Sequence, residues 1–172
     1  QIWGSKSWWK DGKIHRDEID PENGLALPSD ISNNGKKKWL KEGKKYQNDI
    51  DPDTGLTLPA KILEDGSKKW YKDGKFHRDE IDPKTGFTLH AQIWNNGSKF
   101  WYKKGKKHQD DIDPDTGLFL PAENWGDVSK YWYKDGKYHR DDIDPETGLT
   151  LPAEIPGGDG NKFWWKNGKK HR

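Results

Sequence analysis

Closely spaced carboxylates recur along the chain, most often in the pattern Asp-x-Asp-Pro-x. The two fullest groups are Asp49, Asp51 and Asp53, and Asp111, Asp113 and Asp115. Alternating carboxylates of this kind are typical of calcium loops, which also need Gly at position 6 and Glu at position 12. Here Gly55 stands at position 7 and Ala60 at position 12. We therefore favour a role in turns, with weak calcium binding at these two groups as the alternative.

Histidine is the second residue type that could do chemistry. It recurs at one position of a repeating pattern, with Tyr46 as a single replacement: His15, His77, His108, His139 and His171. A position that accepts tyrosine indicates ring packing or a hydrogen bond, not a metal ligand. Each Asp–His combination occurs several times, and the chain has neither cysteine nor a phosphate loop or nucleophile elbow. We expect no enzymatic activity and no cofactor.

These residues belong to an internal repeat. Trp8, Trp39, Trp70, Trp101 and Trp132 are each 31 residues apart, and Trp164 follows after 32. A fixed period of this size indicates a repeat architecture. The tryptophan positions divide the single array 1–172 into these units: 1–31, 32–62, 63–93, 94–124, 125–155 and a half unit, 156–172.

Three turns delimit each unit. An Asp-Gly type turn, as at 134–137, predicts a tight hairpin with positive φ at both central residues. Asp-Pro-x-Thr-Gly, as at 144–148, predicts a turn in which Asp caps its own backbone and Gly takes a left-handed conformation. A looser Asn-Gly or Asp-Gly stretch precedes the tryptophan. The intervening segments are aromatic and β-branched, without helical periodicity. The predicted fold is all-β: an elongated antiparallel β-hairpin repeat array with about three strands per unit, here 129–134, 137–143 and 149–155.

The motif W-Y-K-x-G-K-x-H-R at 132–140, followed by L-P-A at 151–153, resembles the MORN-variant repeats of large bacteriophages and giant viruses. This resemblance covers the whole chain and implies stacked β-hairpins that act as a scaffold. The sequence does not fix a location, and an extracellular or virion-associated one is favoured. The chain departs from the shorter MORN repeat by an inserted I-D-P-x-T-G-L-x hairpin.

Aligned units predict a core and a surface. The predicted structural core consists of the six repeat tryptophans (Trp8, Trp39, Trp70, Trp101, Trp132, Trp164) and five isoleucines: Ile19, Ile50, Ile81, Ile112 and Ile143. The residues next to the tryptophan face the other way, because side chains alternate along a strand. They form a candidate binding or assembly face: Trp9, Tyr71, Tyr102, Tyr133 and Trp165, with Phe100, Tyr131 and Phe163. Either a second layer of the same protein covers this face, or it is exposed to a partner.

The charge and hydropathy of the chain limit the classes of partner that it could bind. The formal net charge is +2, with 35% charged residues, and lysines gather on the first hairpin whereas acids gather on the second. Alternating acids would repel phosphate, so we expect no nucleic-acid binding. No apolar run is long enough for a transmembrane segment. The charged stripes are either solvated faces or surfaces that pair copies of the chain.

Two functions follow as hypotheses. The first is a non-catalytic structural protein that self-associates through its ends and aromatic face into a fibre, appendage or scaffold. The second is a repeat module whose aromatic columns bind a glycan or another protein. The units also alternate in detail, Ile14-His15-Arg16 against Lys45-Tyr46-Gln47. An odd number of strands per unit would explain this two-unit period, because it reverses strand direction each time.

Overall fold

The structure is a computed structural model that describes residues 4–126, 128–158 and 160–171. Residues 1–3 and 172, which begin the first unit and end the half unit of the predicted array, lie outside the described residues. The chain divides into two compact units, Gln1–His77 and Arg78–Arg172. All regular structure in the described ranges is short antiparallel β-strand, with no helix and hence none that could cross a membrane. The predicted all-β class of antiparallel hairpins is confirmed.

The first unit combines one sheet with three hairpins. Its sheet has the order β1 (Lys6–Ser7), β4 (Asp30–Ile31), β5 (Lys37–Lys38), β8 (Lys61–Ile62) and β9 (Lys68–Lys69). Each neighbouring pair is antiparallel. The hairpins are β2 (Trp9–Lys10) with β3 (Lys13–Ile14), β6 (Leu40–Lys41) with β7 (Lys44–Lys45), and β10 (Tyr71–Lys72) with β11 (Lys75–Phe76).

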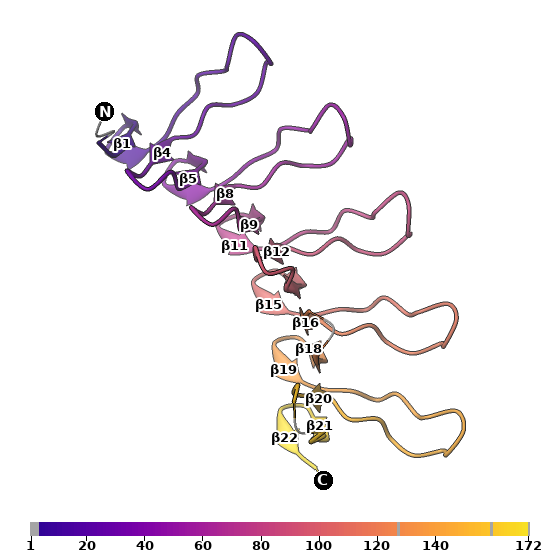
Figure 1. The fold of residues 1–172 in the computed structure, drawn as a ribbon. Coiled ribbons are helices and arrows are strands. Elements are labelled where there is room, and N and C mark those ends of the chain that lie inside the picture. The colour runs from indigo at the N-terminus through magenta and orange to yellow at the C-terminus, as the bar shows by residue number, and fades with distance from the viewer. Residues whose placement is uncertain (1–3, 127, 159, 172) are drawn as a thin grey trace. The chain divides into compact units, whose positions relative to one another are not determined.

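The second unit repeats this plan. Its sheet has the order β12 (Gln92–Ile93), β13 (Lys99–Phe100), β16 (Glu123–Trp125), β17 (Ser129–Tyr131) and β20 (Glu154–Ile155). The hairpins are β14 (Tyr102–Lys103) with β15 (Lys106–Lys107), β18 (Tyr133–Lys134) with β19 (Lys137–Tyr138), and β21 (Trp165–Lys166) with β22 (Lys169–Lys170). In both units the Asp-Pro-x-Thr-Gly segments form long loops that project from the strands (Figure 1).

The predicted turns are present. The first central residue of each tight hairpin has φ of 50–52°, and the following Gly is also left-handed. Asp20 caps the long-loop turn as expected: its carboxylate accepts the Glu22 N–H at 3.0 Å, and its carbonyl accepts the Gly24 N–H at 2.8 Å. Gly24 has φ of 71°, which a glycine adopts without strain. Local turn chemistry therefore decides where each segment ends.

Each of the three predicted strand segments contains a strand, but the segment 129–134 is divided at the tryptophan. In 129–134, β17 belongs to the sheet and β18 to a hairpin. Trp132 joins them because its N–H donates to the Ala153 carbonyl at 2.8 Å while its own carbonyl accepts the His139 N–H at 3.1 Å. Trp132 is thus the point at which the chain leaves the sheet and enters the hairpin.

The repeats in each unit share one orientation, so the proposed strand reversal is wrong. In the first unit β4 is antiparallel to both β1 and β5, which makes β1 and β5 run the same way. The same holds for β13 and β17 on either side of β16. Each repeat contributes two strands to the sheet, and an even number preserves direction.

The alternation between successive repeats instead corresponds to a change in the contact made by the residue after the histidine or tyrosine, which is Arg in some repeats and Gln in others. Arg16 Nε donates to Glu18 at 2.8 Å, whereas in the next repeat the Gln47 amide oxygen accepts the N–H of Asn48 at 3.1 Å. Arg–Glu recurs at Arg78 and Glu80, again at 2.8 Å. The alternation is therefore a local exchange between an ion pair and an amide–backbone contact.

The innermost positions carry small side chains. The last residue of Leu-Pro-Ala is 0–1% exposed throughout: Ala60, Ala91, Ala122 and Ala153. Ser29 occupies the same position in the first repeat, and Ser67 and Ser98 are equally buried. The tryptophan that precedes it in the same repeat donates its backbone N–H to the carbonyl of this residue, as from Trp39 to Ala60 at 2.9 Å. The core is thus a column of close backbone contacts.

The predicted core is only partly correct. Of the repeat tryptophans, Trp70 and Trp132 are buried, and the other four are half-buried. The isoleucines, in contrast, are 49–61% exposed and do not belong to the core; they are Ile19, Ile50, Ile81, Ile112 and Ile143. Each lies in the long loop at a single bridge pair, such as Ile19 with Ala26. Side chains alternate there, and a two-stranded loop has no second layer to cover the isoleucine.

His90 provides a pH-sensitive position in this core. It replaces the proline of Leu-Pro-Ala and contacts the Trp101 ring edge-on, with centroids 5.6 Å apart. Burial, followed by the positive charges of Lys99 and Arg78, lowers the pKa of His90 to about 4. In the unfolded chain a histidine has a pKa near 6.5.

We expect the His90 contribution to stability to be complete above pH ~6.5 and to be lost as the pH falls toward ~4, because only the unfolded chain binds the proton there. The total loss is about 3 kcal/mol, at about 1.4 kcal/mol for each unit of pKa shift. Urea unfolding measured at several pH values tests this, with His90→Pro as the matched control because Pro28, Pro59, Pro121 and Pro152 fill the equivalent positions. Parallel pH profiles for the two proteins would contradict it.

Candidate functional site

Each repeat tryptophan after the first holds the long loop of the preceding repeat. The indole N–H donates to the backbone carbonyl of the loop residue that pairs with isoleucine: Trp39 to Ala26, Trp70 to Thr57, Trp101 to Thr88, Trp132 to Phe119 and Trp164 to Thr150. All five distances are 2.7–2.8 Å. Neither tyrosine nor phenylalanine has a ring N–H, so this contact explains why tryptophan never varies.

A carboxylate from the following repeat binds the N–H of the same loop residue. Asp111 accepts the Thr88 N–H at 2.6 Å and also the Thr88 hydroxyl at 3.0 Å. Asp142 accepts the Phe119 N–H at 3.2 Å. In the first unit Asp49 accepts the Ala26 N–H in the same way. Both polar backbone groups of these loop residues are therefore bound by the next repeat.

The histidines connect neighbouring hairpins. His15 Nδ1 accepts the Glu42 N–H at 3.0 Å, so Nε2 carries the proton of the neutral ring and donates to Asp17 at 2.6 Å. His108 and His139 make the same two contacts. Both ring nitrogens of these three histidines are occupied by hydrogen bonds within the protein. They therefore lock repeats together and leave no free base for proton transfer.

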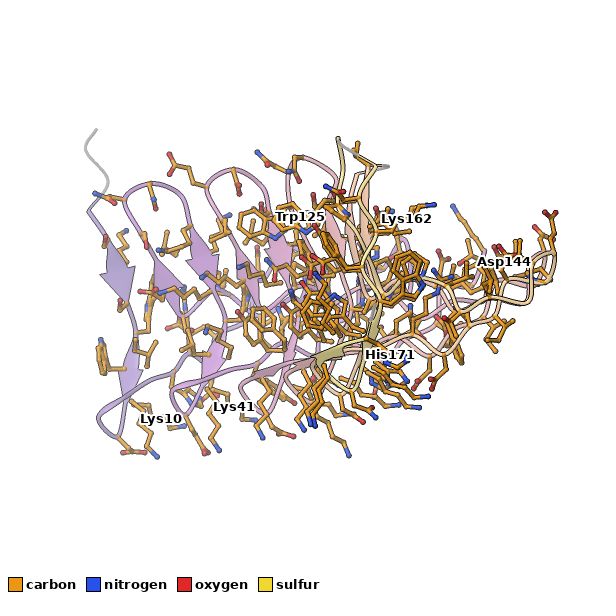
Figure 2. The ribbon with its side chains drawn as sticks, turned by 90° about the horizontal axis from the view of Figure 1, so that it is seen from below. Lys10, Lys41, Trp125, Asp144, Lys162 and His171 are labelled. Atoms are coloured by element: carbon orange, nitrogen blue, oxygen red, sulfur yellow. The ribbon has the colours of Figure 1, made fainter. Side chains whose placement is uncertain are left out.

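The tight turns stack directly on one another. The Gly43 N–H donates to the Ile14 carbonyl of the preceding hairpin at 2.9 Å. A Cβ atom added to Gly43 would lie 3.8 Å from the Lys13 Cβ, so the lysine stem covers the glycine. Figure 2 shows Lys10 and Lys41 along the same edge of this stack. The stacking fixes the lysine stems and directs their ammonium groups to solvent.

The predicted aromatic face is largely closed. Trp9 is 64% exposed, but Phe100 is only 4% exposed, and the other predicted members are half-buried: Tyr71, Tyr102, Tyr133, Trp165, Tyr131 and Phe163. The rings stack on the partner strand or on the next hairpin, with centroid distances of 4.5 Å for Tyr71–Phe76, 4.4 Å for Tyr133–Tyr138 and 5.3 Å for Tyr138–Trp165. Most of this face therefore packs within the repeat stack and is not an open aromatic surface.

A groove lies between successive repeats at two equivalent places. The larger, of about 200 Å³, is in the first unit, and the smaller, of about 50 Å³, is in the second. Trp39 and Lys41 line the first as Trp132 and Lys134 line the second. Asp17 also lines the first groove, and hydrogen bonds from Lys10 and His15 lower its pKa to about 2. Each groove thus combines an indole, a cation and a carboxylate, a set suited to a small polar ligand.

The calcium candidates do not converge. Asp49 binds the preceding loop, Asp51 caps its own turn by accepting the Asp53 N–H at 2.9 Å, and Asp53 lies on the outside of that turn. In the second unit Asp111 and Asp113 have the same separate roles, and Asp115 is likewise exposed. Across the part of the chain that the structure describes, no group of three or more His, Asp or Glu side chains is arranged to hold a metal ion. The favoured role in turns accounts for Asp51 and Asp113.

Sequence reasoning missed the acid that binds the preceding loop and the groove beside it. A signal for the acid was present, since this position is acidic in every full repeat: Glu18, Asp49, Glu80, Asp111 and Asp142. The groove had no such signal, because its constant wall positions, such as Trp39 and Trp132, already had a structural explanation and the residue next to them differs between repeats, as Leu40 and Tyr133 do. Comparisons of the chain with protein-family models, curated proteins and solved structures found no match.

The indole hydrogen bond can be tested by removing its donor. We expect Trp132→Phe to lower the free energy of unfolding by about 1–2 kcal/mol more than Trp8→Phe, because only the first change leaves a loop carbonyl without its donor. The Trp8 indole makes no hydrogen bond within the described residues, while Arg16 and Arg140 cover the two rings at 3.8 and 3.9 Å. Equal losses of stability in urea unfolding would show that ring packing alone matters.

Proposed function

We propose that this protein is a non-catalytic structural repeat protein of MORN-like organisation that self-associates into a fibre, appendage or scaffold. The observation that carries the proposal is that the side chains that recur from repeat to repeat bind the neighbouring repeat. The tryptophan, the acid two residues after Arg or Gln, and the histidine all make contacts from one repeat to the next. A repeat stabilised mainly by its neighbours is suited to building long, regular surfaces.

The same contacts argue against catalysis. A catalytic pair needs one nucleophile or base free to react with a bound substrate. Here the His15–Asp17 pair recurs as His108–Asp110, and in both the second ring nitrogen accepts a backbone N–H of the next hairpin. These histidines and aspartates act as structural groups under this proposal.

Self-association is supported by the separation of charge within each repeat. Exposed lysines flank the tight turns, while exposed acids gather on the long loops. A surface that presents the same feature at every repeat binds another such surface at several points at once, and weak contacts then add to a strong association. A stack of repeats therefore provides multivalency without any specialised site.

We expect the purified chain to form filaments, sheets or other regular assemblies when concentrated. Negative-stain electron microscopy and sedimentation velocity over a range of concentrations measure this. A circular dichroism spectrum recorded on the same samples controls for folding. Discrete monomers at high concentration, with the β signal intact, would contradict the proposal.

The paired grooves favour a second function, a module that binds a glycan or another protein. Under this alternative, the tyrosines and the polar side chains of the groove walls provide the aromatic and polar contacts for a saccharide. We expect glycan-array binding to be lost in Tyr133→Ala, which alters a groove wall, and kept in Tyr131→Ala, whose side chain lies outside the groove. Binding that is absent from the unaltered protein, or equally lost in both variants, would count against this alternative.

A further inference from the structure

Every long loop carries one exposed isoleucine flanked by acids. The sequence around it is Asp-Glu-Ile-Asp-Pro in the first repeat and Asp-Asp-Ile-Asp-Pro in the fifth. Single exposed apolar side chains are ordinary on protein surfaces, whereas an apolar residue exposed at the same place in all five loops forms a pattern. We define the loop edge as these isoleucines with the exposed residue after each loop proline, which is an acid in four of the five loops: Glu22, Asp53, Asp115 and Glu146. Its isoleucines are Ile19 and Ile50 in the first unit and Ile81, Ile112 and Ile143 in the second.

The loop edge is held in a fixed conformation. Each isoleucine pairs with the residue whose carbonyl accepts the tryptophan indole of the next repeat, as Ile112 pairs with Phe119 and Trp132 binds Phe119. The loops therefore stand in register within each unit. Asp144, which caps the turn of the fifth loop, lies near the far end of that loop (Figure 2). A partner would meet a preformed row and would not have to order it, which lowers the entropic cost of binding.

A second row of opposite charge lies on the hairpins. Lysines face one another directly across each tight hairpin, for example Lys41 and Lys44. Like charges at opposed positions destabilise a hairpin, so the fold itself does not favour this arrangement. The second lysine of each pair makes no ion pair with any described residue; we define these six as the hairpin edge: Lys13, Lys44 and Lys75 in the first unit, and Lys106, Lys137 and Lys169 in the second.

We propose that the loop edge of one copy docks on the hairpin edge of a second copy of this chain, an inference that rests on the proposed self-association and names its surface. The two edges are complementary in charge. Each full repeat contributes one loop and one hairpin, so within a unit the two rows also share a common spacing. Burial of the isoleucines against the lysine stems adds an apolar contribution, since a lysine stem covers apolar surface while its ammonium group remains in water.

The charge half of this interface can be reversed without altering the turns. The residue after the loop proline is acidic in four loops and is Lys84 in the third, so the fold tolerates lysine there. We expect the combined variant E22K/D53K/D115K/E146K to need at least about tenfold higher concentration to assemble, because several contacts are lost together. A partner variant with the six hairpin-edge lysines changed to Glu should be equally impaired. An equimolar mixture of the two variants should assemble again.

The apolar half is tested by changing the five loop-edge isoleucines to Thr, which keeps a β-branched side chain in the bridge pair. The matched control is Val128→Thr, a change of another exposed β-branched side chain that is 64% exposed and lies outside the loop edge. Sedimentation velocity at low and high salt, with circular dichroism to verify folding, measures both. The expected result is loss of assembly in the isoleucine variant only.

Two negative results have different meanings. If the unaltered protein stays monomeric, the proposed structural function and this inference fail together. If the unaltered protein assembles and the isoleucine and charge-reversed variants assemble equally well, the docking surface is wrong and self-association stands. The same conclusion holds if the mixture of the two charge-reversed variants does not recover assembly. Loss of assembly in a separate Trp9→Thr variant, with the isoleucine variant unaffected, would overturn the docking surface and assign the interface to the exposed aromatic residue instead.

Discussion

The hydrogen bond from each tryptophan indole to the loop carbonyl of the preceding repeat is the interaction on which the rest of the structure depends. It joins residues 13 or 14 positions apart and positions the long loop against the next repeat. The same loop residue donates its N–H to Asp111 or an equivalent acid. With both backbone groups bound, a loop of only one bridge pair becomes a fixed part of the stack. Buried backbone groups must find such partners, and here the next repeat supplies them.

This dependence accounts for the unusual composition. Only 29% of the residues are hydrophobic, too few for an ordinary globular core, and the most buried positions are alanine and serine. Small side chains let successive backbones approach closely, while indole, carboxylate and imidazole groups make the contacts between repeats. A repeat stack needs little apolar area per unit because every repeat shares its two faces with neighbours. The exposed isoleucines are then free of any role in the core and are available for another surface.

The repeat, its turns and the all-β class could be predicted because each depends on local chemistry. Positive φ at Asp11 and Gly12, and the carboxylate cap of Asp20, follow from residue type and spacing alone. The tryptophan position was recognised as structural, but the reason for its invariance, the indole N–H, depends on a carbonyl that the sequence does not locate. The isoleucine positions were misassigned because alternation gives two faces to a strand and does not say which one is covered. For the aromatic residues next to the tryptophan, alternation likewise did not show whether their face is covered or exposed.

The sequence by itself thus determined the period, the turn types and the segments that become extended, since these arise from contacts within about five residues. Only the tertiary structure decided which faces are buried, how Trp132 divides one segment between sheet and hairpin, and that an even number of sheet strands keeps all repeats of a unit in one orientation. It also decided that Asp49 binds the preceding loop rather than a metal ion. These outcomes depend on groups 13 to 28 residues apart, whose meeting is set by how one repeat stacks on the next.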